Sequence, residues 1–256
     1  MSQRPIYLDG HSTTPVDERV LAEMLPYFTQ NFGNASSINH VYGWEAEAAV
    51  KQTREILANA INATPEEIVF TSGATEANNL AIKGVGEAYF QKGQHIITVA
   101  TEHNAVIDPC NYLKTLGFDI TILPVQKDGI INLKELEKAF RPDTILVSVM
   151  AANNEIGVLQ PLAEIGQMCG DRTILFHSDA AQAIGKIPLD VQAMKIDLMS
   201  LTAHKVYGPK GIGALYVRRR NPRVQLAPLV EPGNRTTDIY AIAIDVGTTT
   251  VCGRLI

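Results

Sequence analysis

The sequence predicts a three-layer α/β domain built on a mostly parallel sheet, and two observations support this fold class. Short apolar runs alternate with helical patterns between Glu67 and Val217. Several runs are nearly continuous in apolar residues, which is typical of strands covered on both faces, as in parallel sheets. Because helical patterns separate the runs, we expect helices on both faces of the sheet.

Seven apolar runs are the expected strands. They lie at residues 68–70, 95–100, 120–123, 144–150, 173–176, 198–201 and 213–217. Residues 17–30 and 44–62 predict two helices ahead of the first strand, and shorter helical patterns follow Asp128-Gly129 and Pro161. The clearest helical face follows Gly73 and consists of Ala77, Leu80, Ala81, Gly84, Val85 and Ala88.

The composition of the 256 residues is that of a folded globular protein, with 46% hydrophobic and 19% charged residues. The formal net charge of −5 gives no electrostatic reason to expect nucleic acid. Arg218 to Arg220 form too short a basic run to change this, and we expect them to be a solvated strand end. No apolar run has the length of a membrane span, and no signal peptide is expected.

The three cysteines are Cys110, Cys169 and Cys252. They are odd in number and far apart, so they predict neither a disulfide framework nor a CxxC metal site. A reducing, cytoplasmic setting fits them best. No metal is expected, because four histidines lack any partner pattern and are expected to be structural or exposed: His11, His40, His95 and His177.

Polar residues follow the apolar runs, at the edge where open α/β sheets bind ligands. Thr71 to Glu76 follows the first run and opens a helix. Its small residues and the free N–H groups of the helix favour a phosphate. An ordinary helix cap at Thr75 is the alternative.

Three later strand ends carry similar signals. Asn153 to Gly157 follows the fourth run, and His177 to Gln182 follows the fifth. Asp179 could also cap a helix. Lys205 lies in Thr202 to Gly211, flanked by His204 and followed by two glycine turns, so it is not expected to be a solvated surface lysine. A Walker phosphate loop is excluded there because no strand-GxxxxGK[ST]-helix order is present.

Together these segments resemble the cysteine desulfurases, class V members of the pyridoxal-phosphate (PLP) aminotransferase superfamily. The resemblance covers residues 5 to about 229. It implies that residues 1–229 form the PLP-binding large domain with its N-terminal segment, and that residues 230–256 form a divergent tail. The segments that carry it are Ile6 to Asp9, Thr13 to Pro15, Phe32 to Asn34, Thr101 to His103, Asn153 to Gly157, Asp179 to Gln182 and the Lys205 motif.

The resemblance implies a role for nine residues. Lys205 would carry the cofactor covalently and move protons at the substrate Cα, while Asp179 would pair with the pyridine nitrogen. His103 would stack on the ring and exchange protons. Gln182 would bind the ring oxygen, and Asn154 would lie beside that oxygen and the substrate carboxylate. The phosphate would be held by Ala74, Thr75, Thr202 and His204.

The implied reaction converts L-cysteine to L-alanine and passes sulfur to an acceptor or iron–sulfur scaffold protein. The resemblance also implies a homodimer. Two alternatives remain open at this point. One is a class V lyase or aminotransferase that needs no cysteine nucleophile, and the other is a non-catalytic binding protein with the PLP fold.

The resemblance stops after Leu229. The family's nucleophilic cysteine and carboxylate-binding arginine belong to a smaller C-terminal domain that this sequence is expected largely to lack, as in a truncated or misjoined frame. None of Cys110, Cys169 and Cys252 stands in the nucleophile's sequence context, so this chain is not expected to release sulfur alone. Residues 239–251 resemble a phosphate-binding hairpin of actin-like ATPases and sugar kinases, but a plain hairpin or appendage is the preferred interpretation.

Overall fold

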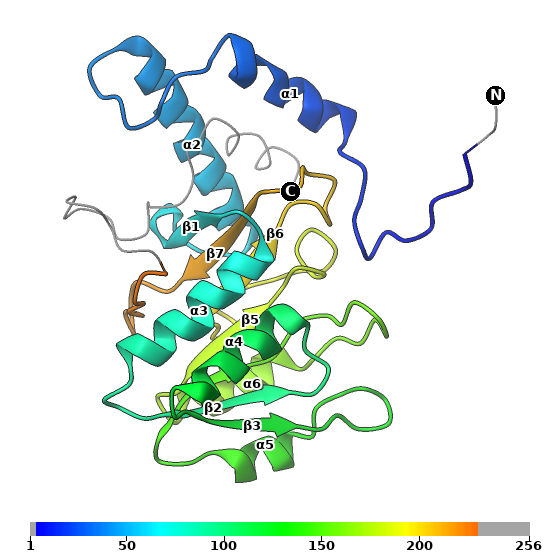
Figure 1. The fold of residues 1–256 in the computed structure, drawn as a ribbon, viewed down its shortest axis with the longest axis vertical. Coiled ribbons are helices and arrows are strands. Elements are labelled where there is room, and N and C mark those ends of the chain that lie inside the picture. Colours follow the sequence, from blue (N-terminus) through cyan, green and yellow to red (C-terminus); the bar gives the residue numbers. More distant parts are fainter. Residues whose placement is uncertain (1–3, 230–256) are drawn as a thin grey trace.

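The central feature of the molecule is a seven-stranded sheet with the strand order β1-β7-β6-β5-β4-β2-β3 (Figure 1). The computed structural model describes residues 4–229. Strand β7 is antiparallel to both of its neighbours, and the remaining pairs are parallel, which confirms the predicted mostly parallel sheet. The strands are β1 (Ile68–Thr71), β2 (His95–Val99), β3 (Asp119–Leu123), β4 (Thr144–Ser148), β5 (Leu175–Asp179), β6 (Leu198–Thr202) and β7 (Gly213–Val217).

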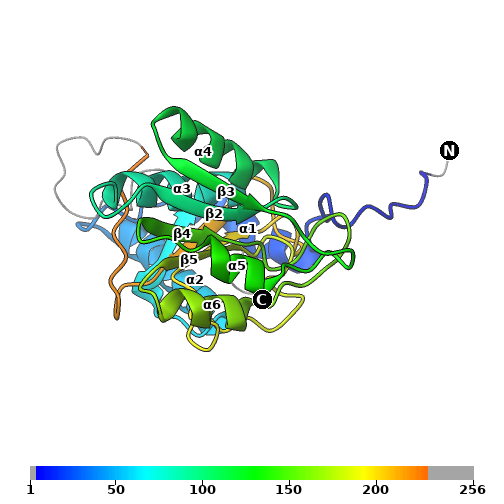
Figure 2. The same cartoon turned by 90° about the horizontal axis from the view of Figure 1, so that it is seen from below.

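Helices cover both faces of the sheet, as predicted (Figure 2). Helices α3 (Ala74–Ala88) and α4 (Asn104–Thr115) lie on one face. Helices α2 (Val41–Ala60), α5 (Leu133–Ala139) and α6 (Leu162–Gly170) lie on the other. Helix α1 (Glu18–Thr29) has only a small apolar cluster of its own and lies beyond the sheet (Figure 1). Within residues 4–229, no helix has the length and apolar character needed to cross a bilayer.

Each strand divides its apolar side chains between two cores, because successive side chains point to opposite faces. In β1, Ile68 and Phe70 join the core under α2, α5 and α6, whereas Val69 joins the core under α3 and α4. In β2, Ile97 joins the core under α2, α5 and α6, and Ile96 joins the core under α3 and α4. Because both faces are buried, the strand sequences are nearly continuous in apolar residues and do not alternate between apolar and polar residues.

Strand β5 begins and ends later in the chain than the sequence predicted. The expected strand covered residues 173–176, whereas the observed strand includes His177 and Asp179. The His177 ring is fully buried and bonds Ser148 Oγ at 2.8 Å and Ser200 Oγ at 3.0 Å on the neighbouring strands. These two partners satisfy a polar ring inside the sheet, so His177 is structural. Burial lowers its pKa to about 3.

The expectation for Arg218 was wrong. This side chain follows β7 but is buried, and its Nε lies 3.0 Å from Asp197 Oδ1. Its guanidinium also donates to the carbonyls of Val191 and Ile196. The desolvated charge is therefore balanced by a carboxylate and by backbone oxygens.

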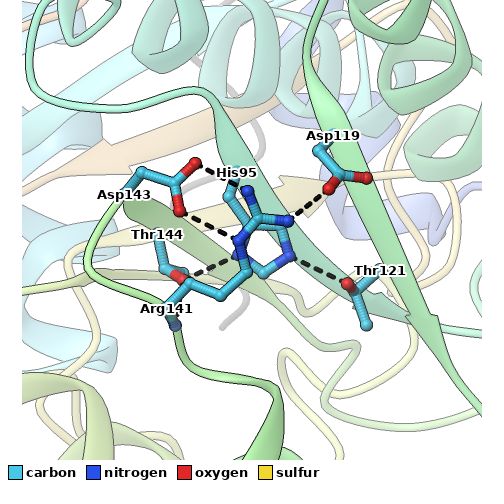
Figure 3. Close-up of polar contacts among 6 residues, drawn as sticks. All are labelled: His95, Asp119, Thr121, Arg141, Asp143 and Thr144. Atoms are coloured by element: carbon cyan, nitrogen blue, oxygen red, sulfur yellow. Dashed lines mark hydrogen bonds and ion pairs between the residues drawn. The ribbon is translucent and has the colours of Figure 1, made fainter.

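The amino ends of β2, β3 and β4 carry a polar cluster, shown in Figure 3. The ring nitrogens of His95 bond Thr144 Oγ1 at 2.7 Å and Thr121 Oγ1 at 2.8 Å. Arg141 forms ion pairs with both Asp119 and Asp143. Three adjacent strands are thus cross-linked by side chains at this edge.

Candidate cofactor site

A cavity of about 540 Å³ opens at the carboxyl ends of β1, β2, β4, β5 and β6. This is the edge at which parallel sheets bind ligands. Among residues 4–229, no group of three His, Cys, Asp or Glu side chains is arranged to hold a metal ion. All nine residues selected from the sequence line this one cavity: Ala74, Thr75, His103, Asn154, Asp179, Gln182, Thr202, His204 and Lys205.

The start of α3 forms one wall of the cavity. Gly73 caps this helix with a φ of 153° and without a side-chain hydrogen bond, so the alternative of a helix cap at Thr75 is wrong. Thr75 lies in the first turn and lines the cavity with Ala74 and Glu76. A helix start with small residues and no capping side chain suits an anion.

Asp179 is buried at the end of β5, and its two oxygens have fixed partners. Oδ1 accepts from the backbone N–H of Ala181 at 2.9 Å, and Oδ2 accepts from Asn78 Nδ2 at 2.7 Å. No helix follows Asp179 before Asp197, so the helix-cap alternative is wrong for this residue as well. The carboxylate retains acceptor capacity for another donor, because each oxygen can accept more than one hydrogen bond.

Lys205 lies in the loop after β6, and its side chain is half-buried. Burial lowers the pKa of its amine, Asp179 opposes this by raising the pKa, and the Lys186 charge lowers it again. A lowered pKa increases the fraction of neutral, nucleophilic amine. An amine in this setting is suited to covalent chemistry with a carbonyl carbon.

The N-terminal segment holds the Lys205 loop in place. The backbone N–H of Thr14 donates to the His204 carbonyl at 2.8 Å, and Tyr207 N donates to Thr14 Oγ1 at 2.8 Å. His204 Nδ1 lies 3.1 Å from Thr13 Oγ1. Residues about 190 positions apart therefore form one wall of the cavity.

Two predicted ring contacts already have protein partners. Gln182 Nε2 donates to the His11 carbonyl at 2.8 Å, and its Oε1 accepts from Lys186 Nζ at 3.2 Å. His103 Nδ1 accepts from Ala105 N at 3.0 Å and caps α4. The Gln182 amide has a second N–H, so it can keep its His11 partner and still donate to a ligand.

The partner of Asp179 was not predicted from the sequence. Asn78 is fully buried in α3, and its Nδ2 fixes the orientation of the carboxylate. One feature of the sequence points to Asn78. This polar residue lies one helical turn before Ile82, and both side chains are fully buried. Lys210, Ser12 and Thr13 also line the cavity and were not selected.

The two described cysteines lie away from the cavity and are poor nucleophiles. Cys110 and Cys169 are both buried and free. Burial raises the pKa of the Cys110 thiol to about 12 and raises that of the Cys169 thiol as well. Since the thiolate is the reactive form, neither thiol is activated. Cys252 and the expected tail hairpin lie outside the described residues.

The family of the chain follows from a comparison of its sequence with known families. The family model described as aminotransferase class-V matches residues 6–247. The chain belongs to the class-V aminotransferases. The match extends past residue 229, where the resemblance was expected to stop.

This class-V aminotransferase is similar to proteins named cysteine desulfurase. It is 59% identical to the one from Homo sapiens over 232 residues, which are 91% of this chain and 50% of that protein. The chain thus spans about half the length of the curated relatives that it matches. Among solved structures, a NifS-like protein aligns with a TM-score of 0.90 at 37% identity, covering 98% of this chain and 68% of that one.

A further structural relative is described as SspA in complex with cysteine. It aligns with a TM-score of 0.86 at 40% identity and covers 96% of this class-V chain and 70% of that one. Its α/β fold agrees with the seven-stranded sheet described here.

Proposed function

We propose that the protein is a PLP-dependent cysteine desulfurase, and that its cofactor binds in the cavity at the carboxyl edge of the sheet. One observation carries the proposal most directly. A half-buried lysine, a buried carboxylate and a helix start converge on a single cavity, and they come from three different strand ends. PLP presents three complementary groups, namely an aldehyde, a ring nitrogen and a phosphate.

The residues present fit this cofactor. The cavity volume of about 540 Å³ lies in the range of small-ligand sites, which is about 300–1,000 Å³. The Lys205 amine suits the aldehyde, and Asp179 has acceptor capacity left for a protonated ring nitrogen. The first turn of α3 suits the phosphate, together with the nearby Thr202 and His204.

Each side chain would then have a defined task. When bound, PLP supplies an electron sink for charge that develops at the substrate Cα. Lys205 would hold the cofactor and move the proton at the substrate Cα. Asp179 would hold the proton on the ring nitrogen, and His103 would cover the ring face and exchange protons. Asn154 and Gln182 would orient the ring oxygen and the substrate carboxylate.

The substrate is proposed from the relatives. Proteins named cysteine desulfurase share 59% of their aligned residues with this chain, and the related SspA structure is described as a complex with cysteine. We therefore propose L-cysteine as substrate, L-alanine as product and a sulfur-acceptor or iron–sulfur scaffold protein as partner. A homodimer in the cytoplasm is proposed with it, and two free thiols suit a reducing compartment.

One observation favours a second candidate function. Cys110 and Cys169 are buried with raised pKa values, and neither lines the cavity. A class V lyase or aminotransferase reaction needs no cysteine nucleophile. Products separate the candidates, because desulfuration of cysteine gives alanine, whereas the lyase reaction gives pyruvate and ammonia.

The test of the cofactor site is covalent labelling of the full 256-residue chain. The chain is incubated with PLP, reduced with borohydride, digested and mapped by mass spectrometry. The label is expected on Lys205 and should be lost in Lys205→Ala but retained in Lys210→Ala. A label on Lys186 or Lys210 in the parent would overturn the assignment.

The reaction is tested separately with cysteine, PLP and a reductant. Neither described thiol is activated, so the chain alone is expected to form alanine and sulfide no faster than free PLP does. Catalytic alanine formation that survives replacement of Cys110 and Cys169 would assign the sulfur step to Cys252. Loss of that activity in either replacement would contradict the assignment of these thiols as inactive.

A further inference from the structure

Glu102 is a buried carboxyl group beside the cavity that no step above uses. It follows β2 and directly precedes His103, and its residue is 8% exposed. Oε1 accepts from the backbone N–H of Met150 at 2.6 Å. Oε2 is buried and has no hydrogen-bond partner within the described part of the chain. One half of this carboxyl group is thus fixed and the other half is unpaired.

Within the described part of the chain, the Glu102 carboxyl group accepts one hydrogen bond, from the backbone N–H of Met150. The titratable groups that interact with it are Asp179 at the end of β5 and the neutral Cys110 thiol on α4. Asn78, which donates to Asp179, has a buried carbonyl oxygen that also has no donor. A negative charge on Glu102 would be repelled by the Asp179 carboxylate, and one of its two oxygens would have no hydrogen-bond donor.

We propose that Glu102 is a positioning residue of the cofactor site and that it works as a neutral carboxylic acid. In this form Oε1 still accepts from Met150, and the unpartnered Oε2 carries a proton in place of a negative charge. Asp179 is then the single negative charge of this pair. Burial, followed by the Asp179 charge, raises the pKa of Glu102 well above its usual range, which agrees with the geometry.

The hydrogen bond to Met150 has a structural consequence for the cavity. Met150 and His103 both line the cavity, one after β4 and the other after β2. A second bond joins the same two segments, because Asn153 Nδ2 donates to the Thr101 carbonyl at 2.9 Å. Glu102 therefore fixes the loop that carries the proposed ring-stacking residue against the loop that forms an adjacent wall.

The link to PLP rests on the function proposed above, but the protonation state does not. It is tested first on the full chain without cofactor, with glutamate labelled by ¹³C at the side-chain carboxyl. At neutral pH we expect an infrared carbonyl band of a protonated carboxylic acid, and this band should be absent from Glu102→Gln. Absence of the band in the parent would overturn the proposal, and this readout of the parent does not depend on the variant.

The pH dependence of unfolding gives a second readout. A carboxyl group that stays protonated in the folded state releases its proton on unfolding above its ordinary pKa of about 4.3. The unfolded state then binds fewer protons, so stability falls as pH rises up to the folded-state pKa. The unfolding constant of the parent should rise relative to Glu102→Gln by about tenfold per pH unit in this window. Equal slopes would contradict a neutral Glu102.

Cofactor affinity tests the positioning role. Glu102→Gln keeps an acceptor for Met150 and an N–H donor, so we expect its PLP affinity to stay within about threefold of the parent's. Glu102→Ala should lose about tenfold, and Glu135→Gln, an exposed control, should not change. Equal losses in the Gln and Ala variants would overturn the proposal. If the parent fails to bind PLP while the infrared band of the protonated acid is present, the proposed function is wrong, but the proposed protonation state of Glu102 is still supported.

Discussion

The two edges of the parallel sheet use the same kinds of residue for opposite purposes. At the amino edge, both His95 nitrogens have hydroxyl partners and Arg141 pairs with two carboxylates (Figure 3). At the carboxyl edge, Lys205 forms no hydrogen bond or ion pair within residues 4–229, although it lines a cavity with Asp179. Polar side chains that satisfy one another hold the strands together at the amino edge, whereas the unpaired Lys205 amine at the carboxyl edge remains available for a ligand.

The largest effect is expected from a substitution at the carboxyl edge of the sheet. Asp179→Ala removes the charge proposed to face the ring nitrogen, and loss of one partner of a buried ion pair costs about 3–5 kcal/mol. We expect PLP affinity to fall by at least about a hundredfold, measured by spectroscopic titration. Asp190→Ala is the matched control, because Asp190 caps an exposed turn away from the cavity. An Asp179→Ala protein that binds PLP like the parent would show that the carboxylate has no role in binding.

The second-largest effect is expected from a substitution at the amino edge of the sheet. His95→Ala leaves a cavity and removes the ring partner of the buried Thr144 hydroxyl and the partly buried Thr121 hydroxyl, so the free energy of unfolding should fall by about 2–4 kcal/mol. PLP affinity of the folded protein should not change. Chemical denaturation measures the first quantity and titration the second. Thr121→Val removes one of the two bonds and should cost only about 0.5–1.5 kcal/mol. A cofactor defect in His95→Ala would mean that the two edges are coupled.

A smaller effect lies at the centre of the sheet and depends on pH. The folded-state pKa of His177 is about 3, below the ordinary value of about 6.5, so unfolding takes up a proton between these values. The stability contributed by neutral His177 is therefore present above about pH 6.5 and is lost as pH falls. Between pH 6 and 5 the parent should lose about 1.4 kcal/mol per pH unit more than His177→Gln does. Parallel stability profiles would mean that His177 titrates normally.

The smallest expected effect is at the exposed end of the same amino-edge cluster. Arg141→Gln removes both ion pairs, yet these charges are solvated and contribute little. The loss in melting temperature should be smaller than that of His95→Ala, and it should disappear in about 1 M salt, where screening is nearly complete. A loss that persists in high salt would indicate that the hydrogen bonds, not the charges, hold this corner.

Apolar periodicity predicted all seven strands and placed six of them to within two residues, because buried strands and amphipathic helices leave different spacings. It misplaced β5, since His177, Ser178 and Asp179 are polar and read as the residues after a strand. Their partners, such as Ser148 and Ser200, come from other strands, and one sequence gives no sign of such pairing. The antiparallel insertion of β7 between β1 and β6 was unpredictable for the same reason.

The candidate site was predicted more completely than the contacts that support it. Nine residues line one cavity because each lies at the end of a strand or in the segment after it, and strand ends meet at one edge. Asn78 and Glu102 were not selected, because their importance depends on burial beside Asp179. Arg218 was taken for a solvated residue, and only its three-dimensional neighbours explain how its charge is tolerated.

The antiparallel strand also sets the order in which the protein can assemble during synthesis. Among the strands of residues 4–229, β1 pairs only with β7, and Thr71 lies opposite Gly213. The turn at Gly73, which opens α3, is therefore anchored by residues that leave the ribosome long after it does. Such a long-range pairing is slow to form, because the entropy cost of closing the loop comes before the stabilising contacts between the strands are made. A nascent chain that ends before residue 213 can contain every other described strand and still lack the strand that anchors the turn at Gly73.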